Sequence, residues 1–339
     1  MSSPDLPPIP VIDVGPDFPV QTLDAETARA HQLMDIATRG VPRLALKSLD
    51  AVSRRWLVRH GNTYLGEIDR ISAKLDRPGA YYLSINYEWG CTVSVRPGAG
   101  GAAPRLARTL DWGIPGIGRN IIAARIAGAA GPFTALTWPG FTGVMQAMAP
   151  ARFSAAINQA PMRRLGGGTL PTDWAANRMR VWHMPHQLAA HLLRRVFETA
   201  PDFATARAML RDEPIAAPAT FTLAGVYPHE TCVIERLETQ AHVIDGPSGA
   251  ANHWRGLDHG ARSRGIDSEG RLAAMMAAGE HELSTDFGWL EAPILNPTTR
   301  LVMVADAAQG RLIAQGWEEM APATAVLDLA THRAQRVSA

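Results

Sequence analysis

The sequence predicts an α+β fold in which two mostly antiparallel sheets lie between helices. A helical block precedes residue 91, and short apolar runs separated by Gly and Pro fill most of the chain after residue 111. Such runs are typical of antiparallel strands. Helix pairs interleave with the strand groups, which favours a layered arrangement around one core. We find no internal repeat and no linker long enough to divide the chain.

The N-terminal block is expected to be extended at first and then helical. Its first twenty residues are rich in Pro and contain a short strand over 11–14. Apolar residues recur at helical spacing in 23–39 and again in 64–75, where an Arg-Pro-Gly sequence ends the second helix. A run of Tyr, Leu and Ile over 81–87 then predicts a strand that reaches Gly90.

The rest of the chain alternates between groups of strands and pairs of helices. β-branched and aromatic runs bounded by Gly, Pro, Asn and Asp predict the strands, and apolar stripes at helical spacing predict the helices. The predicted strands cover 92–96, 105–110, 120–127, 133–138, 143–149, 153–158, 220–226, 231–237, 242–244, 301–306 and 311–315. The predicted helices cover 187–200, 203–211 and 271–280, and a glycine loop is expected at 166–168.

Composition bounds the function before any motif is used. The 339 residues are 46% hydrophobic, enough to bury a sizeable core. A net charge of +1 gives no reason to expect a nucleic-acid partner. Cys91 and Cys232 are the two cysteines, so no disulfide framework is required. The start of the chain lacks a signal-peptide pattern and no run of eighteen apolar residues follows, so we expect a cytoplasmic protein.

A cysteine at the start of a strand is the first candidate functional residue. Cys91 follows a glycine, and the Gly/Pro-rich segment 97–103 predicts a hairpin whose returning strand carries Arg108 and Asp111. Because paired strands bring their ends together, a thiol, a cation and a carboxylate converge. A single Cys is more often a small core residue, which is how we interpret Cys232, but this combination predicts that Cys91 is a nucleophile.

This stretch resembles a known enzyme family. A Cys-Thr pair that opens a strand, an Arg seventeen residues later and an Asp three residues beyond it, in ARTLDWG, are similar to the Ntn cysteine hydrolases of the acid ceramidase, N-acylethanolamine acid amidase and choloylglycine hydrolase group. The resemblance implies a four-layer αββα fold and self-cleavage of the bond between Gly90 and Cys91. Residues 1–90 would form a small helical chain and residues 91–339 the catalytic chain, and the two would stay associated as one folded unit.

A cysteine at a new N-terminus carries its own general base. A free α-amine titrates at about 7.7 to 8.0, so near neutral pH it can accept the thiol proton. Arg108 would lower the pKa of the thiol, because a permanent positive charge favours the thiolate. Asp111 would accept a hydrogen bond from the amine and orient it.

The resemblance also implies oxyanion donors and a second cation. Asn252 in AANHWRG is similar to the family's Thr-Asn motif, although Ala replaces the Thr, and Asn158 would supply another donor. The second cation is expected at Arg264, with Arg262 as the alternative. Gln159 stands where the acid ceramidase branch tends to carry Glu, which weakens a direct assignment of ceramidase activity.

Other candidate residues concern the substrate and metals. Trp138 and Trp254 are expected to line an apolar acyl pocket, with ordinary packing as the alternative for each. His183 and His186 are three residues apart, but no acidic or Cys cluster accompanies them, so we expect no metal and no cofactor.

Together these features predict an amidohydrolase that cleaves a linear amide of an N-acylated amine, such as an N-acylethanolamine, a ceramide or a related fatty-acid amide, through a thioester. Three alternatives stay open: an acyltransferase of the isopenicillin-N kind, a bile-salt or penicillin-type amidase, and an unprocessed homologue that binds lipid amides without turnover. The expected partner is a small acyl amide. Weak contact with a membrane or lipid aggregate, through the helices of 187–211, and homo-oligomer formation are also left open.

Overall fold

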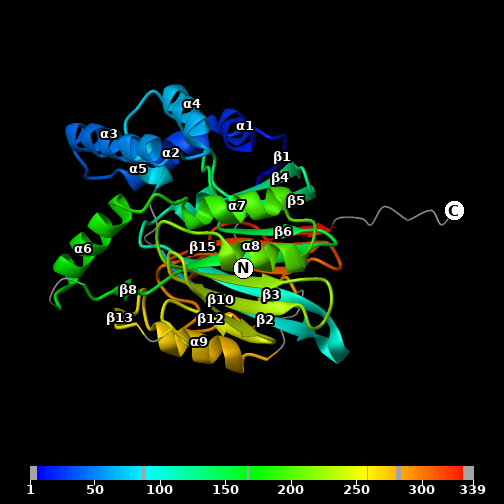
Figure 1. Ribbon diagram of the computed structural model, residues 1–339. Helices are drawn as coiled ribbons and strands as arrows, with labels where there is room; N and C mark the ends of the chain where they lie inside the picture. Colours follow the sequence, from blue (N-terminus) through cyan, green and yellow to red (C-terminus); the bar gives the residue numbers. More distant parts are fainter. Residues whose placement is uncertain (1–5, 86–88, 166–167, 258, 280–283, 331–339) are drawn as a thin grey trace.

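The computed structural model describes residues 6–85, 89–165, 168–257, 259–279 and 284–330. Two large sheets lie face to face in its centre, and a group of helices formed by the N-terminal part of the chain sits at one end of them (Figure 1).

The first sheet has eight strands within the described residues, in the order β1-β4-β5-β6-β7-β9-β10-β11. Only the pairing of β1 with β4 is parallel among these described strands. Their bounds are β1 Val11–Val14, β4 Ile122–Gly128, β5 Gly131–Thr137, β6 Gln146–Ala149, β7 Phe153–Gln159, β9 Ala219–Ala224, β10 Thr231–Arg236 and β11 Ala241–Asp245.

The second sheet contains the cysteine hairpin. Its order is β12-β2-β3-β14-β15-β16, and β17 also pairs with β15. The strands are β2 Gly90–Gly98, β3 Ala102–Asp111, β12 Ser248–Ala250, β14 Thr299–Asp306, β15 Arg311–Glu318, β16 Ala321–Pro322 and β17 Leu327–Ala330. A separate ladder joins β8 Met162–Arg163 to β13 Ala261–Arg262. Short 3-10 turns are η1 Ala99–Gly101 and η2 Ile117–Asn120.

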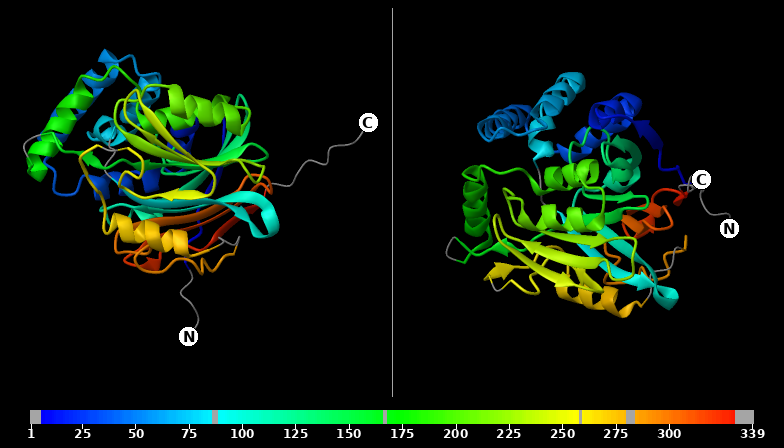
Figure 2. Two further views of the ribbon diagram at one scale, coloured as in Figure 1. Left: turned by 60° about the horizontal axis from the view of Figure 1, so that its bottom comes forward. Right: turned by 45° about the vertical axis from the view of Figure 1, so that its right-hand side comes forward.

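Helices cover the outer faces of both sheets. Helices α7 (Ala189–Thr199) and α8 (Phe203–Asp212) pack on the first sheet, and α9 (Ser268–Ala277) packs on β2 and β12 of the second (Figure 2). The apolar stripe of α7, including Leu192 and Val196, is fully buried in the central core. This order of helix, sheet, sheet and helix confirms the predicted α+β class and its four layers.

The remaining helices form the N-terminal block and one neighbour. They are α1 Phe18–Ala25, α2 Thr27–Ala37, α3 Arg43–Arg59, α4 Leu65–Leu75, α5 Ala80–Ser84 and, later in the chain, α6 Leu170–Trp182. The helical character predicted for this block is confirmed, although the helix expected over 23–39 is divided at Glu26. Helices α3 and α6 were not predicted from the sequence.

The strand predicted over 81–87 is wrong in its described part. Residues 80–84 form α5, while residues 86–88 lie outside the described residues. The helix starts because the carboxylate of Asp50, on α3, accepts hydrogen bonds from the backbone nitrogens of Gly79 at 2.6 Å and Tyr82 at 2.9 Å. These are first-turn donors that have no partner within a helix. A carboxylate distant in sequence therefore overrides the local strand preference of the Tyr and Leu side chains.

Exposed apolar side chains explain why α3 and α6 escaped prediction. On both helices, large apolar residues lie on the exposed face as well as the covered one, so no single stripe marks them. The exposed members are Leu44, Leu49, Val52, Val58, Leu170, Trp174 and Met179. By contrast, the helices of 187–211, which were considered for membrane contact, pack on the sheet. Among the described residues, seven of the thirteen exposed large hydrophobic side chains therefore lie on α3 and α6.

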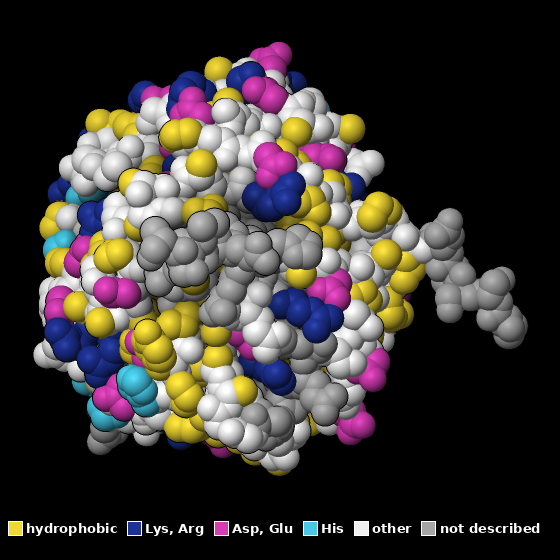
Figure 3. Space-filling model, turned by 90° about the vertical axis from the view of Figure 1, so that its right-hand side faces the viewer, with side chains coloured by type: hydrophobic (Ala, Val, Ile, Leu, Met, Phe, Trp, Pro, Cys, Tyr) yellow, Lys and Arg dark blue, Asp and Glu magenta, His cyan; other side chains and the backbone are white. Residues whose placement is uncertain are grey.

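Elsewhere the surface mixes charges. On the face drawn in Figure 3, acidic and basic side chains are interspersed, in keeping with a net charge of +1. Among the helices that the structure describes, none is both long enough and apolar enough to span a membrane.

A buried arginine joins the N-terminal block to α7. Arg194 is 2% exposed and its guanidinium bonds Glu67 of α4 at 2.5 and 2.9 Å and Glu198 at 2.7 Å. The same guanidinium lies 4.0 Å from the ring centre of Tyr64 and 4.5 Å from that of Phe18. Cation–π contacts add to the ion pairs when the cation is shielded from water. We refer to this group of five residues as the Arg194 clamp.

Next to the clamp, His191 is buried without charge. Its two ring nitrogens lie 3.1 Å from Asn62 Nδ2 and 3.1 Å from Thr142 Oγ1. Burial, assisted by the positive charge of Arg194, lowers the pKa of His191 to about 3. The neutral imidazole thus connects the N-terminal block, α7 and the loop before β6.

We expect acid to destabilise the protein through His191. In the unfolded chain a histidine has a pKa of about 6.5, so between that value and about 3 only the unfolded state binds the proton. Stability should therefore fall as pH drops from about 6.5, by up to about 1.4 kcal/mol per pH unit. Urea unfolding across this range should show a shallower fall for His191→Gln, which cannot titrate. Equal slopes for the two proteins would contradict this account.

Candidate active site

The β2–β3 hairpin determines which side chains meet. Cys91 pairs with Leu110 and Val93 pairs with Arg108. Because side chains alternate along a strand, Cys91 and Arg108 share the face that points between the two sheets. The neighbouring positions, Thr92 and Asp111, point to the opposite face, on which α9 packs.

The thiol of Cys91 is fully buried against a guanidinium. Arg108 Nη2 lies 2.8 Å from Cys91 Sγ, and the carbonyl oxygen of Ile157 on β7 lies 3.9 Å from it. Burial raises the pKa of the thiol to about 12, even though Arg108 acts in the opposite direction. The close contact with Arg108 favours a thiolate, but removal of the whole pair from water outweighs it. The thiol is therefore neutral near pH 7.

Asn158 anchors the other side of Arg108. Its Oδ1 accepts a hydrogen bond from Arg108 Nη1 at 3.1 Å, and its Nδ2 donates to the carbonyls of Ala250 at 3.1 Å and Ala251 at 3.3 Å. The side chain thus links β7 of the first sheet to the cysteine hairpin of the second.

Asn252 holds the main chain at the cysteine. Its Oδ1 accepts a hydrogen bond from the backbone nitrogen of Cys91 at 2.9 Å, while its Nδ2 donates to the carbonyl of Gln159 at 2.8 Å. Ser268 fixes its backbone by accepting from the Asn252 nitrogen at 2.8 Å. The side-chain nitrogens of Asn158 and Asn252 are therefore both bonded to backbone carbonyls, and Asn252 offers an acceptor to the Cys91 nitrogen. The oxyanion role of the two asparagines stays a prediction.

A second buried cation reaches the site from α9. Arg271 is fully buried, and its guanidinium lies close to four oxygens around the cysteine. They are the Cys91 carbonyl at 2.8 Å, Thr92 Oγ1 at 2.6 Å, Asp111 Oδ2 at 3.1 Å and Asn252 Oδ1 at 2.9 Å. Two arginines therefore approach the start of β2 from opposite faces, Arg108 at the thiol and Arg271 at the main chain.

Arg271 supplies a buried guanidinium at the cysteine, where a second cation was expected from Arg264 or Arg262. Arg264 reaches this network through its backbone, whose nitrogen donates to the Asn252 carbonyl at 3.0 Å. Arg262 instead pairs with Asp173 at 2.9 Å, at the edge of α6. The position of the second cation was predicted from the number of residues that separate it from the Asn along the loop. Residue spacing in a loop does not reveal that the first turn of the next helix lies against the cysteine. The available signal was an Arg at the start of the helix predicted over 271–280.

Asp111 completes the outer side of the site. Besides Arg271, its carboxylate accepts a hydrogen bond from Thr299 Oγ1 at 2.9 Å. Burial raises the pKa of Asp111, and Arg271 opposes this effect. Directly across the strand pair lies Gly90, where an added Cβ would come within 3.3 Å of Asp111 Cβ and 3.6 Å of Asn252 Oδ1. The position before the cysteine is therefore tightly enclosed.

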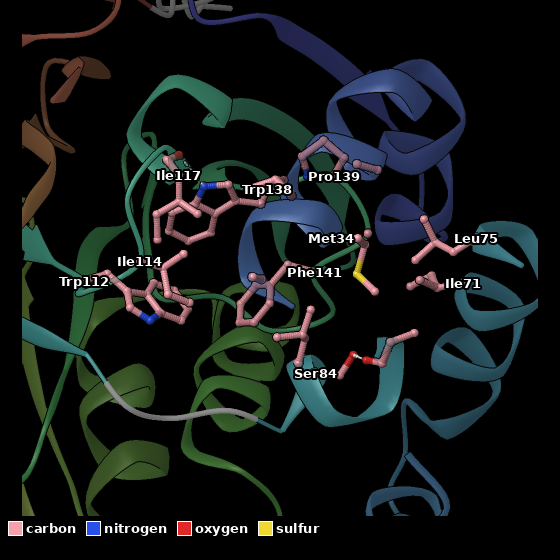
Figure 4. Close-up of a pocket in the computed structure, with 16 residues that line it drawn as sticks. Met34, Ile71, Leu75, Ser84, Trp112, Ile114, Ile117, Trp138, Pro139 and Phe141 are labelled. Carbon is pink, nitrogen blue, oxygen red and sulfur yellow. Dashed lines mark hydrogen bonds between the residues drawn. The ribbon is translucent and has the colours of Figure 1, made fainter. Parts of the chain in front are cut away.

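Aromatic rings continue from the site towards the N-terminal block. The ring centres of Trp89 and Trp112 are 5.8 Å apart, and those of Trp112 and Trp138 are 5.6 Å apart. Trp112 and Trp138 line an apolar cavity of about 110 Å³ beneath α2, α4 and α5 (Figure 4). Trp138 thus lines an apolar cavity, whereas Trp254 is not among the residues that line it, and the acyl-pocket role of both stays a prediction.

Within the described ranges, no group of three or more His, Cys, Asp or Glu side chains is arranged to hold a metal ion. The second cysteine, Cys232, is fully buried in β10, and burial raises the pKa of its thiol to about 12.

The chain is similar to several solved structures. An N-acylethanolamine-hydrolyzing acid amidase ortholog from Caenorhabditis elegans is 18% identical with a TM-score of 0.49, over 64% of this chain and 93% of that chain. A mutant conjugated bile acid hydrolase from Clostridium perfringens is 9% identical with a TM-score of 0.40, over 71% of this chain and 92% of that one. Penicillin V acylase from Agrobacterium tumefaciens is 13% identical with a TM-score of 0.34, over 71% and 86%. No protein-family model and no curated protein matches the sequence.

We expect Arg271→Met to be far more destabilising than Arg70→Met. Loss of the Arg271 guanidinium leaves Asp111 buried without its cation, a change that typically costs about 3–5 kcal/mol. Arg70 is the control, because it pairs with Asp17 on the surface, where such a pair contributes little to stability. Urea unfolding of the two variants measures the difference. Similar losses of unfolding free energy would show that Arg271 is not the cation on which the site depends.

Proposed function

We propose that this chain is a self-processing amidohydrolase that cleaves the linear amide bond of an N-acylated amine through Cys91. The observation that carries this proposal is the contact of 2.8 Å between Cys91 Sγ and Arg108, at a residue whose backbone nitrogen is held by Asn252 and whose predecessor is an enclosed glycine. Such an arrangement supports a nucleophile better than a structural core cysteine, because a core cysteine needs no buried cation.

In the first stage Cys91 would cut its own chain. The thiol attacks the carbonyl carbon of Gly90, the thiol proton passes to the backbone nitrogen of Cys91, and the peptide becomes a thioester. Water then releases the Gly90 carboxylate and restores the thiol, which leaves Cys91 with a free amine. Asn252 Oδ1, which accepts a hydrogen bond from this nitrogen at 2.9 Å, would accept one from the new amine.

In the second stage the amine would act as the general base for the thiol beside it. Arg108 stabilises the thiolate, which attacks the substrate carbonyl and forms a thioester with the acyl group. The departing amine takes the proton from the α-ammonium, and water then releases the acid. Arg271 and Asp111 would hold the start of β2 in position from the opposite face. The apolar cavity lined by Trp112 and Trp138 supports an apolar acyl group.

The two fragments of such a cut would stay together. The Arg194 clamp joins α4 of the N-terminal segment to α7 of the catalytic part. Trp56 Nε1 also donates to the carbonyl of Val181 at 3.0 Å, and His60 Nε2 lies 3.1 Å from the carbonyl of Trp182. These contacts support a stable pair of chains after cleavage.

We expect the purified protein to separate into two masses, corresponding to residues 1–90 and 91–339, with amidase activity in the cleaved form. Intact-mass spectrometry and an N-acyl amide assay measure the two events. Cys91→Ala should abolish both because it removes the attacking sulfur, whereas Cys232→Ala, which removes a core thiol on β10 of the other sheet, should leave both in place.

Two results would contradict the proposal. Amide cleavage by Cys91→Ala would exclude Cys91 as the nucleophile. A wild-type chain that remains uncut and inactive under all conditions would favour a protein that binds acyl amides without turnover.

We expect the cleaved Arg194→Met protein to release its N-terminal fragment at a lower urea concentration than the cleaved wild type. The substitution leaves Glu67 and Glu198 without their shared cation and removes a charge from two aromatic rings. Arg311→Met is the matched control, because Arg311 pairs with Asp328 on the surface, where such a pair contributes about 1 kcal/mol or less. Size-exclusion chromatography in urea follows the release. Equal release by the two variants would show that the Arg194 clamp does not hold the fragments.

A further inference from the structure

Two cavities lie on either side of the Phe141 side chain. The smaller one, of about 30 Å³, lies near the candidate nucleophile. Cys91 does not line it, but Asn158 and Ile157 do, and the carbonyl oxygen of Ile157 is 3.9 Å from Cys91 Sγ. The larger one, of about 110 Å³, lies beneath the N-terminal helices. Phe141 and Ser84 line both cavities, so these two side chains separate them.

The ring of Phe141 is the more substantial part of this partition. Figure 4 shows the ring among Trp112, Ile114, Ser84 and Met34, all of which line the larger cavity. The hydroxyl of Ser84 is turned back to its own helix, where it donates to the carbonyl of Ala80 at 2.7 Å. An aromatic ring and a small serine therefore divide the space.

Neighbouring residues hold the Phe141 ring in place. It meets the ring of Trp138 edge-on, with centres 6.4 Å apart and planes at 89°, and its backbone nitrogen donates to the Trp138 carbonyl at 3.1 Å. A Cβ at Gly143 would come within 3.1 Å of the ring, so the ring packs closely on the backbone of this glycine. The ring is partly buried, and these contacts hold it against Trp138 and the backbone of Gly143.

We infer that Phe141 sets the upper limit on the length of the acyl group, an inference that rests on the proposed function. The cavity beside the nucleophile has about the volume that one water molecule occupies in the liquid, which is enough for one or two carbons. A longer chain must pass the ring to reach the larger cavity, which is itself smaller than an apolar cavity of about 150 Å³ that holds benzene. Along this route the preferred substrates are amides of short apolar acyl groups, of roughly two to six carbons.

The test uses N-acylethanolamines with acyl groups of about two to twelve carbons, a range chosen to exceed the room in both cavities. Turnover is measured with the wild type and Phe141→Ala, and binding is measured by calorimetry with Cys91→Ala and with Cys91→Ala/Phe141→Ala. Removing the ring joins the cavities. The ratio of kcat/KM for the longest acyl group to kcat/KM for a four-carbon acyl group should therefore rise by about tenfold or more, and the affinity for the longest group relative to the four-carbon group should rise by a similar factor. Phe141→Trp, which enlarges the partition, should shift the preference towards shorter groups.

Phe287→Ala is the matched control. Phe287 is 3% exposed and belongs to a separate apolar cluster that includes Met275 of α9, so its loss should lower stability without changing the preference for acyl length. If the wild type hydrolyses these amides and Phe141→Ala has an unchanged length preference, the inference is wrong and the proposed function stands. If no amide is hydrolysed but the binding preference still shifts with Phe141→Ala, the role of Phe141 stands and the proposed function fails.

Discussion

The contact between Arg108 and Cys91 is the constraint on which the rest of the site depends. A guanidinium that is fully buried between two sheets must have polar partners, because an unpaired charge in the interior is strongly destabilising. Its partners here are the thiol on β2 and the amide of Asn158 on β7. The need to satisfy one cation therefore fixes how the cysteine hairpin sits against the opposite sheet.

Arg271 meets the same requirement from the other face. Arg108 is held between the sheets, whereas Arg271 is held between the second sheet and α9, and the main chain at Cys91 passes between the two cations. The alternation of side chains along β2 and β3 makes this possible, because neighbouring residues present a thiol to one arginine and a hydroxyl and a carboxylate to the other. The layered fold thus supplies a separate positive charge to each side of one short segment.

Elements and site residues whose positions depend on neighbouring residues could be predicted from the sequence. Those whose positions depend on contacts with residues distant in sequence could not. Cys91, Arg108 and Asp111 belong to one hairpin, so alternation and a tight turn were enough to place them together. Arg271 is brought back by a loop whose path no spacing records. Likewise, the strand expected over 81–87 was displaced by α5, because Asp50 from another helix bonds its first turn. The layer order was predictable because the spacing of apolar residues indicates which faces of helices and strands are buried. The path of a loop, by contrast, is determined by contacts with residues distant in sequence.

The Arg194 clamp has a consequence that comes from mass action. While the chain is whole, its contacts form within one molecule, and dilution does not affect them. A cut after Gly90 would convert the same contacts into an interface between two chains, whose integrity depends on protein concentration as any binding equilibrium does. His191 lies in that interface as a neutral buried imidazole, so a fall in pH would act on association as well as on folding. A single covalent event would thus change the protein from one whose stability is independent of its abundance to one whose stability is not.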